Sequence, residues 1–191
     1  MRQIGPAFRM MLLMTVLTGL IYPGVVTAVC QILFPRQANG SLVEMDGHVA
    51  GSELIGQNFT RPQYFHPRPS AAGNGYDPTA SGGSNYGPTN QHLIDRVKAS
   101  VVQFRKENPA FNGPIPADIV TASASGLDPE ISLASAHAQA ARVASARGAI
   151  IGDVERLIDS HVERPTWGLI GEPRVNVLML NLELDRQFSR K

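Results

Sequence analysis

The chain has 191 residues, a formal net charge of +1 and an apolar fraction of 43%. This length predicts a single globular domain with room for an appendage, and the apolar fraction is sufficient for a packed core. The charge is balanced, and no run of Lys or Arg exists that could neutralise a phosphate backbone. We therefore expect no nucleic-acid partner.

The apolar residues are concentrated near the N-terminus, where the 25 residues from Met10 to Phe34 contain no charge. A helix of this length exceeds the ~30 Å hydrocarbon core of a bilayer, whereas a buried helix of a soluble protein is usually about half as long. The sequence therefore predicts one N-terminal transmembrane helix followed by a mixed α/β (α+β) extracytoplasmic domain. The expected segments are a cytoplasmic N-terminus (1–9), a transmembrane helix (10–34) and an extracytoplasmic domain (35–191).

The predicted orientation depends on the charges that flank the helix. Arg2 and Arg9 precede it, whereas only Arg36 follows it closely and the next basic residue is Arg61. Because basic residues are retained on the cytoplasmic side, this excess places the N-terminus in the cytoplasm.

Two other interpretations of the apolar segment remain open. A cleaved signal peptide would use the small residues around Ala28, but apolar residues continue through Phe34 and would begin the released protein. A lipoprotein anchored at Cys30 would need a small residue before the cysteine, where this chain has Val29. We rank a retained anchor first, a cleaved signal second and a lipoprotein third.

Cys30 is also the single cysteine of the chain, so no intramolecular disulfide, cysteine-based zinc site or cysteine nucleophile is expected in the outer domain. Gly19, Pro23 and Gly24 are expected to interrupt the apolar helix. The pairs Thr15/Gly19 and Gly24/Ala28 have the small-xxx-small spacing that lets another helix approach closely in lipid. Gly19, Gly24 and Ala28 are therefore candidate interaction residues.

Capping residues and apolar spacing predict the elements of the outer domain. Short strands are expected within 40–55, followed by a proline-punctuated aromatic segment, 59–69. Asn90 should cap a helix that ends at Asn108, because the intervening apolar residues have helical spacing. Further expected elements are a strand at 119–121, a helix from Asp128-Pro129 to Arg147 with Gly148 as its C-cap, a short helix capped by Asp153, and a C-terminal helix within 175–187, where the alternating pattern also allows a strand.

The residues do not indicate an enzyme. The five histidines lack the spacing of a metal box such as H-E-x-x-H, and a triad of Ser81 or Ser84 with His66 and Asp77 lacks the G-x-S-x-G elbow. The stretch from Ser81 to Ser84 resembles part of the signature loop of ABC transporters, but the chain has no Walker lysine. Glycines required by a tight turn explain that stretch more simply.

Pro69–Asn90 is the least ordinary part of the domain. It contains five glycines, three prolines and one charge, Asp77. Composition alone suggests a flexible linker, yet a 22-residue loop inside a compact domain is rare and usually functional. We therefore expect an ordered loop.

Four blocks of the outer domain together carry a family resemblance: GSELIGQ (51–57), YFHPRPSA (64–71), SGGSNYGPTN (81–90) and VTASASGLDPEIS (120–132). With the single N-terminal span and the terminal NVLMLNLEL, they resemble the C subunit of the Kdp potassium-transporting ATPase, KdpC. The resemblance covers almost the whole chain in order. Ala124 departs from it, since the family more often has glycine at that position.

The resemblance implies a non-catalytic subunit of a high-affinity, ATP-driven potassium uptake pump in the bacterial inner membrane. Its implied partners are a channel-like potassium-translocating subunit (KdpA), a P-type ATPase subunit (KdpB), a small single-span subunit (KdpF) and the lipid bilayer. No firmly bound cofactor is implied; potassium is handled by the complex. The family is proposed to raise the ATP affinity of the pump subunit, although the predicted topology separates this domain from cytoplasmic ATP.

Within this framework the glycine-rich loop is expected to pack on the potassium-translocating subunit. Glycines would allow positive φ and close approach, and tyrosines would supply anchoring surface. Packing of the loop on its own domain is the alternative. The candidate contact residues are Tyr76, Ser81, Gly82, Gly83, Ser84, Asn85, Tyr86 and Gly87.

Two other classes of function remain open from the residues alone. A membrane-anchored or secreted binding module for an extracytoplasmic ligand would need a pocket, and a hydrolase would need an assembled catalytic constellation.

Overall fold

A computed structural model of the chain describes residues 3–45 and 47–188. The chain divides into two compact units, Met1–Val43 and Glu44–Lys191. Arg2, one of the two arginines on which the predicted orientation depends, lies outside the described residues.

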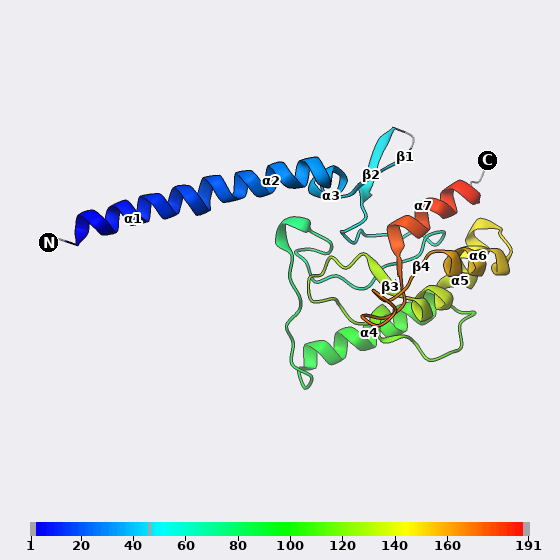
Figure 1. The fold of residues 1–191 in the computed structure, drawn as a ribbon. Coiled ribbons are helices and arrows are strands. Elements are labelled where there is room, and N and C mark those ends of the chain that lie inside the picture. The colour runs from blue at the N-terminus through cyan, green and yellow to red at the C-terminus, as the bar shows by residue number, and fades with distance from the viewer. Residues whose placement is uncertain (1–2, 46, 189–191) are drawn as a thin grey trace. The chain divides into compact units, whose positions relative to one another are not determined.

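The first unit is dominated by one apolar helix of 30 residues, Ile4–Leu33, which is long and apolar enough to cross a membrane by length and composition (Figure 1). None of its residues is buried. The helix begins at Ile4, six residues before the uncharged stretch, and residues 5–9 belong to it. Its parts are α1 (Ile4–Val16), a π-helical turn (Leu17–Ile21) and α2 (Tyr22–Leu33), followed by α3 (Pro35–Ala38).

The expected interruption of this helix takes the form of a π-helical turn, and the helix does not break there. Pro23 has no N–H group, and its ring would clash with the carbonyl of Gly19 in a regular α-helix. The backbone widens there instead: the N–H of Tyr22 donates to the carbonyl of Leu17, five residues earlier. The helix thus continues through Pro23 without a break.

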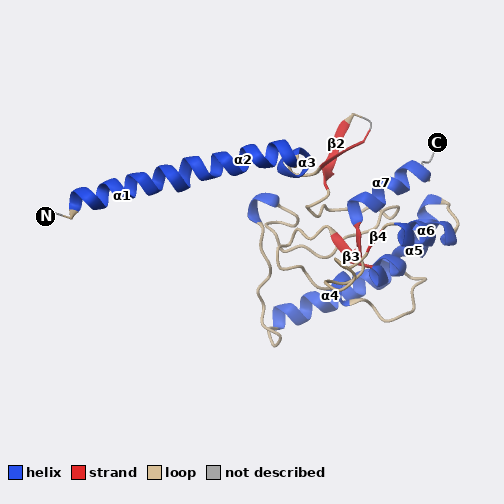
Figure 2. Ribbon diagram, viewed as in Figure 1, coloured by secondary structure: helices blue, strands red, loops and turns tan. Residues whose placement is uncertain are grey.

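Two small sheets follow, both made of short strands. The hairpin of β1 (Leu42–Met45) and β2 (His48–Ser52) confirms the strands predicted within 40–55. The second sheet, of which Figure 2 labels β3 and β4, is antiparallel in the order β3-β5-β4. Ile131 and Val162 both pair with Val175 of the central strand. Its strands are β3 (Glu130–Ser132), β4 (Val162–Glu163) and β5 (Arg174–Asn176).

Three helices build the main core with the β3-β5-β4 sheet. Helix α5 packs on β3, β5 and α6, and α7 packs on β5 and α6. The core is aliphatic with one aromatic ring, Phe65, fully buried at its centre. The helices are α5 (Leu133–Arg147), α6 (Ile151–Ser160) and α7 (Val177–Gln187). The mixed helix-and-sheet character of the domain is therefore as predicted, and so is the helix near the C-terminus.

A second, smaller core lies under α4 (Gln91–Glu107), where Phe104 packs with Ile119, Val120 and Ala138. The predicted N-cap is confirmed, since the Asn90 side chain accepts a hydrogen bond from the N–H of His92 at 2.8 Å.

Three local predictions are wrong. Residues 119–121 form no strand; the chain makes a 3₁₀ turn at Ala117–Ile119. Helix α5 starts five residues after Asp128, because Glu130–Ser132 pairs with β5 and Ser132 caps the helix through its hydroxyl. Asp153 lies within the first turn of α6 and does not cap it. The predicted end of α5 is confirmed, as Gly148 adopts the left-handed conformation with φ 66°.

Candidate functional site

The π-helical turn determines how the small residues of the apolar helix are arranged. Gly19 and Gly24 are five residues apart, and in a regular α-helix this spacing rotates Gly24 by ~140° from Gly19. The wide turn at Leu17–Ile21 holds one residue more than an α-helical turn. Gly24 therefore lies relative to Gly19 as a residue four positions further along a regular α-helix would. The other two steps, from Thr15 to Gly19 and from Gly24 to Ala28, are four residues, so all four small residues follow one face of the helix.

No contact within residues 3–45 and 47–188 explains the two glycines of this face. A Cβ atom added at Gly19 or at Gly24 would have no neighbour within 4 Å, and neither residue has a positive φ. No contact within the described residues therefore requires these two positions to lack a side chain. This is consistent with a face that receives the backbone of another helix.

The first part of the glycine-rich loop packs on its own domain. The phenol of Tyr76 donates a hydrogen bond to the carbonyl of Arg68, and the N–H of Tyr76 donates to Ser70 Oγ at 2.8 Å. The hydroxyl of Ser81 and the N–H of Gly82 both donate to the Ser125 carbonyl, at 3.0 and 2.9 Å. Tyr76, Ser81 and Gly82 therefore hold the loop to its own domain by hydrogen bonds.

Gly83 approaches the backbone of its own domain closely. A Cβ atom at Gly83 would lie 2.8 Å from the carbonyl oxygen of Ala124. The expectation that Gly82, Gly83 and Gly87 supply positive φ is wrong, since none of the three has it. The left-handed positions of the loop include Tyr76 (φ 57°) and Asn85 (φ 51°).

The second part of the loop is the part that presents surface. Asn85, Tyr86 and Gly87 are exposed, and Ser84 is half-buried. The Tyr86 ring lies beneath the guanidinium of Arg96, whose carbon is 5.7 Å from the ring centroid. A tyrosine held this way on α4 can offer a fixed apolar face to a partner.

Sequence reasoning missed the way in which the segment YFHPRP is held. Phe65 and His66 belong to none of the strands in the described part of the chain. The buried carboxamide of Asn181 accepts from the N–H of Phe65 at 2.8 Å and donates to its carbonyl at 3.0 Å. Gln139 does the same for His66, at 2.8 and 3.1 Å. The two side chains replace a neighbouring strand, and we call them the amide clamp.

Arginines from α5 hold the residues just before this clamp. The guanidinium of Arg147 pairs with Asp185 at 2.7 Å, donates to the carbonyl of Gln63 at 2.8 Å and lies over the ring of Tyr64. Arg142 donates to the Tyr64 carbonyl at 2.9 Å, and burial lowers the pKa of Arg142 to about 10. The segment is thus fixed from two helices, α5 and α7.

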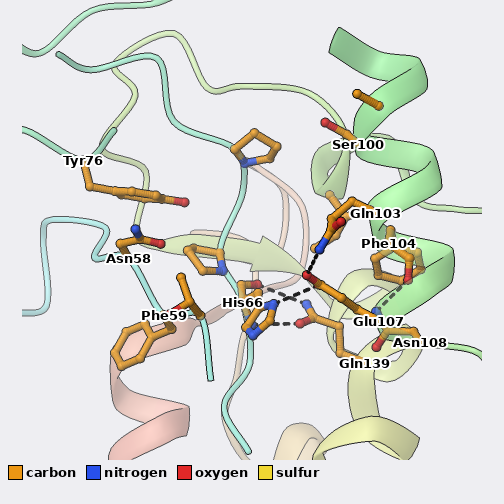
Figure 3. Close-up of a pocket in the computed structure, with 15 residues that line it drawn as sticks. Asn58, Phe59, His66, Tyr76, Ser100, Gln103, Phe104, Glu107, Asn108 and Gln139 are labelled. Carbon is orange, nitrogen blue, oxygen red and sulfur yellow. Dashed lines mark hydrogen bonds and ion pairs between the residues drawn. The ribbon is translucent and has the colours of Figure 1, made fainter. Parts of the chain in front are cut away.

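The clamped segment forms one wall of a cavity of about 530 Å³, and α4 forms another (Figure 3). His66 is part of the clamped wall and faces α4, with Nδ1 3.3 Å from Glu107 and Nε2 3.1 Å from the Arg61 carbonyl. Burial, together with the charge of Arg142, lowers the pKa of His66 in spite of Glu107. His66 is therefore mostly neutral at pH 7, and Glu107 is the one carboxylate among the polar and apolar side chains that line the cavity.

The structure does not assemble the Ser/His/Asp set considered from the sequence. His66 is paired with Glu107, and Asp77 accepts hydrogen bonds from Thr79, which lower the pKa of its carboxyl group. The hydroxyl of Ser81 is directed to a backbone carbonyl. Among residues 3–45 and 47–188, no three His, Cys, Asp or Glu side chains are grouped as metal ligands.

The fold and these sites define a class of protein, a small mixed α/β domain carried by one apolar N-terminal helix. A family model described as the c chain of K⁺-transporting ATPase, KdpC, matches residues 4–186. Curated proteins named potassium-transporting ATPase KdpC subunit are similar over nearly the whole chain. One from Myxococcus xanthus is 57% identical over 184 residues, which are 96% of this chain and 87% of the relative.

Two further relatives with that name agree. The protein from Caulobacter vibrioides is 57% identical over 186 residues (97% of this chain, 93% of the relative), and the one from Mycobacterium tuberculosis is 55% identical over 187 residues (97% and 98%). The chain therefore belongs to the KdpC family, as the sequence resemblance predicted.

Proposed function

We propose that this chain is the non-catalytic accessory subunit of an ATP-driven potassium uptake pump, where it contributes to assembly of the complex. Its partners are the potassium-translocating subunit KdpA, the P-type ATPase subunit KdpB and the small subunit KdpF. The observation that carries the proposal is the family match over residues 4–186, because it includes both the apolar helix and the domain.

The direct test is recovery of the complex. The full-length chain, co-expressed with the other subunits and captured through a tag on KdpB, should copurify in detergent in a fixed ratio. Removal of its gene should abolish growth at low potassium, and the wild-type gene should restore it. A chain that copurifies with no multi-span ATPase would contradict the proposal.

The topology is part of the proposal. Residues 10–34 span the membrane, residues 1–9 remain in the cytoplasm and residues 35–191 lie outside it, because the basic residues are concentrated before the helix. ATP is cytoplasmic, so an effect on the ATP affinity of KdpB would be transmitted through the helix and not by nucleotide bound in this domain.

Protease accessibility tests this topology. A protease added to intact spheroplasts should digest the domain, while cytoplasmic marker proteins survive. Mature protein that begins at Val29 would show a cleaved signal peptide, and full protection of the domain would show the opposite orientation.

The exposed half of the glycine-rich loop provides a second prediction. Tyr86→Ala and Gly87→Val should lower potassium uptake at low external potassium and leave the melting temperature unchanged. Tyr86 is exposed, and a Cβ at Gly87 would have no neighbour within 4 Å. Gly83→Val serves as the contrast, because its Cβ would meet the Ala124 carbonyl and the domain should lose stability. Normal uptake by both exposed variants would exclude a contact at this part of the loop.

A further inference from the structure

The connection between β4 and β5 carries the most exposed apolar side chains of the described domain. Trp167 is 86% exposed, Leu169 is 87% exposed and Ile170 is 60% exposed. They lie at the tip of an extension that is closed by one β-bridge, in which Thr166 and Ile170 exchange hydrogen bonds of 2.9 and 3.1 Å. We call Trp167, Leu169 and Ile170 the hairpin tip. Its exposure is a property of an ordered turn.

The backbone at the hairpin tip is strained, and no packing of Trp167 within the domain compensates for this strain. Trp167 and Gly168 have φ of 55° and 75°, the sign pattern of a type I′ turn, which asparagine followed by glycine adopts most easily. A bulky residue at positive φ is uncommon and costs free energy. Trp167 recovers none of this cost by packing, because its side chain remains in solvent. The strain therefore points to a contact made outside the domain.

The size and charge of the hairpin tip narrow the choice of partner. The three side chains expose roughly 400–500 Å² of mainly apolar surface, which is typical of functional patches but only about half of one side of a standard protein interface. A self-sufficient dimer is therefore not expected from this contact alone. The tip suits an anchor within an assembly that other contacts also hold.

The charges around the base of the hairpin argue against a lipid surface. Arg174 is paired with Glu130 at 2.7 Å and with Glu163 at 3.2 Å, and the exposed Arg164 is balanced by the exposed Glu172. Anionic lipids attract clusters of unpaired basic residues, which the described part of this hairpin lacks. A large aromatic ring beside aliphatic side chains on a rigid turn is instead typical of an interface hot spot.

We propose that the hairpin tip docks into an apolar pocket, lined by aliphatic and aromatic side chains, on another protein chain of the potassium-transport complex. This inference rests on the function proposed above. The docking surface is distinct from both the helix face and the glycine-rich loop.

The test compares complexes purified with the wild-type chain and with Trp167→Asn/Leu169→Ser. Asparagine before Gly168 suits the turn better than tryptophan, so the melting temperature of the variant should be equal or higher. Loss of a tryptophan hot spot should raise the dissociation rate from the complex by about tenfold or more. Ile150→Ser is the control, because Ile150 is an apolar side chain elsewhere in the domain that is also largely exposed, at 71%, and its replacement should leave dissociation unchanged.

A photoreactive amino acid at position 167 identifies what covers the tip. Crosslinks to another subunit support the proposal, whereas crosslinks to lipid alone would overturn it. A double variant that dissociates as slowly as the wild type would also overturn it, while leaving the proposed function intact. Failure of the wild-type chain itself to copurify would overturn both.

Discussion

Replacing Asn181 by leucine should lower the free energy of unfolding by about 3 kcal/mol, or the melting temperature by roughly 6–12 °C. Leucine has nearly the same shape as asparagine but forms no hydrogen bonds. Asn181 is buried and bonds both backbone groups of Phe65, which is itself fully buried. Two buried polar groups would lose their partners at a cost of ~1–3 kcal/mol each, partly offset by the apolar side chain. Thermal unfolding of the full-length chain in detergent measures the effect.

Asn112→Leu provides the control, since it makes the same chemical change at an exposed position. It should shift the melting temperature little, as surface substitutions usually do. Gln139→Leu should behave like Asn181→Leu, because Gln139 holds His66 in the same manner. If the Asn181 variant has the same melting temperature as the wild type, water replaces the carboxamide and the amide clamp is not a source of stability.

Local signals predicted several elements well. The caps at Asn90 and Gly148 were identified from the sequence because capping involves only neighbouring residues. The single apolar helix was predicted from its length and lack of charge, and the structure has it as one continuous helix.

Elements that depend on distant residues were not predicted. Asp128-Pro129 has the sequence of a helix start, but the next three residues pair with β5, more than 40 positions later. In the amide clamp, Asn181 holds Phe65, which is 116 positions earlier, and a contact over this distance produces no periodic pattern in the sequence. One local signal existed: Asn181 shares a helix face with Val177, Leu178 and Leu184, which are three or four residues away, and a polar residue on an apolar helix face needs a partner.

The glycine-rich loop lies between these cases. Its order was predicted from its length and position, whereas its neighbours were not. Ser81, Gly82 and Gly83 contact the segment at Ala124 and Ser125, and no spacing along the chain reveals that contact. Length and position therefore predicted that the loop is ordered, and only the structure separates its packed half from its exposed half.

The second large effect is expected for the apolar helix. Gly19→Leu combined with Gly24→Leu should lower recovery of the complex about tenfold or more while membrane insertion stays normal, because leucine keeps the partner helix from close backbone contact. Neither glycine has an internal neighbour, so the chain itself should not be disturbed. Val25→Leu, which enlarges a residue away from this face, is the control. Copurification through a tag on KdpB gives the recovery.

Two variants of helix length test whether the π-helical turn aligns this face. One alanine inserted after Leu20 rotates Gly24 and Ala28 by ~100° relative to Thr15 and Gly19, unless the turn widens further. Deletion of Leu20 combined with Pro23→Ala, which removes the clash that the wide turn relieves, lets a regular α-helix keep the four small residues at spacings of four. The insertion should therefore weaken assembly as the leucine pair does, and the deletion should preserve it. Equal recovery of the two variants would show that the face needs no alignment and that the outer domain alone directs assembly.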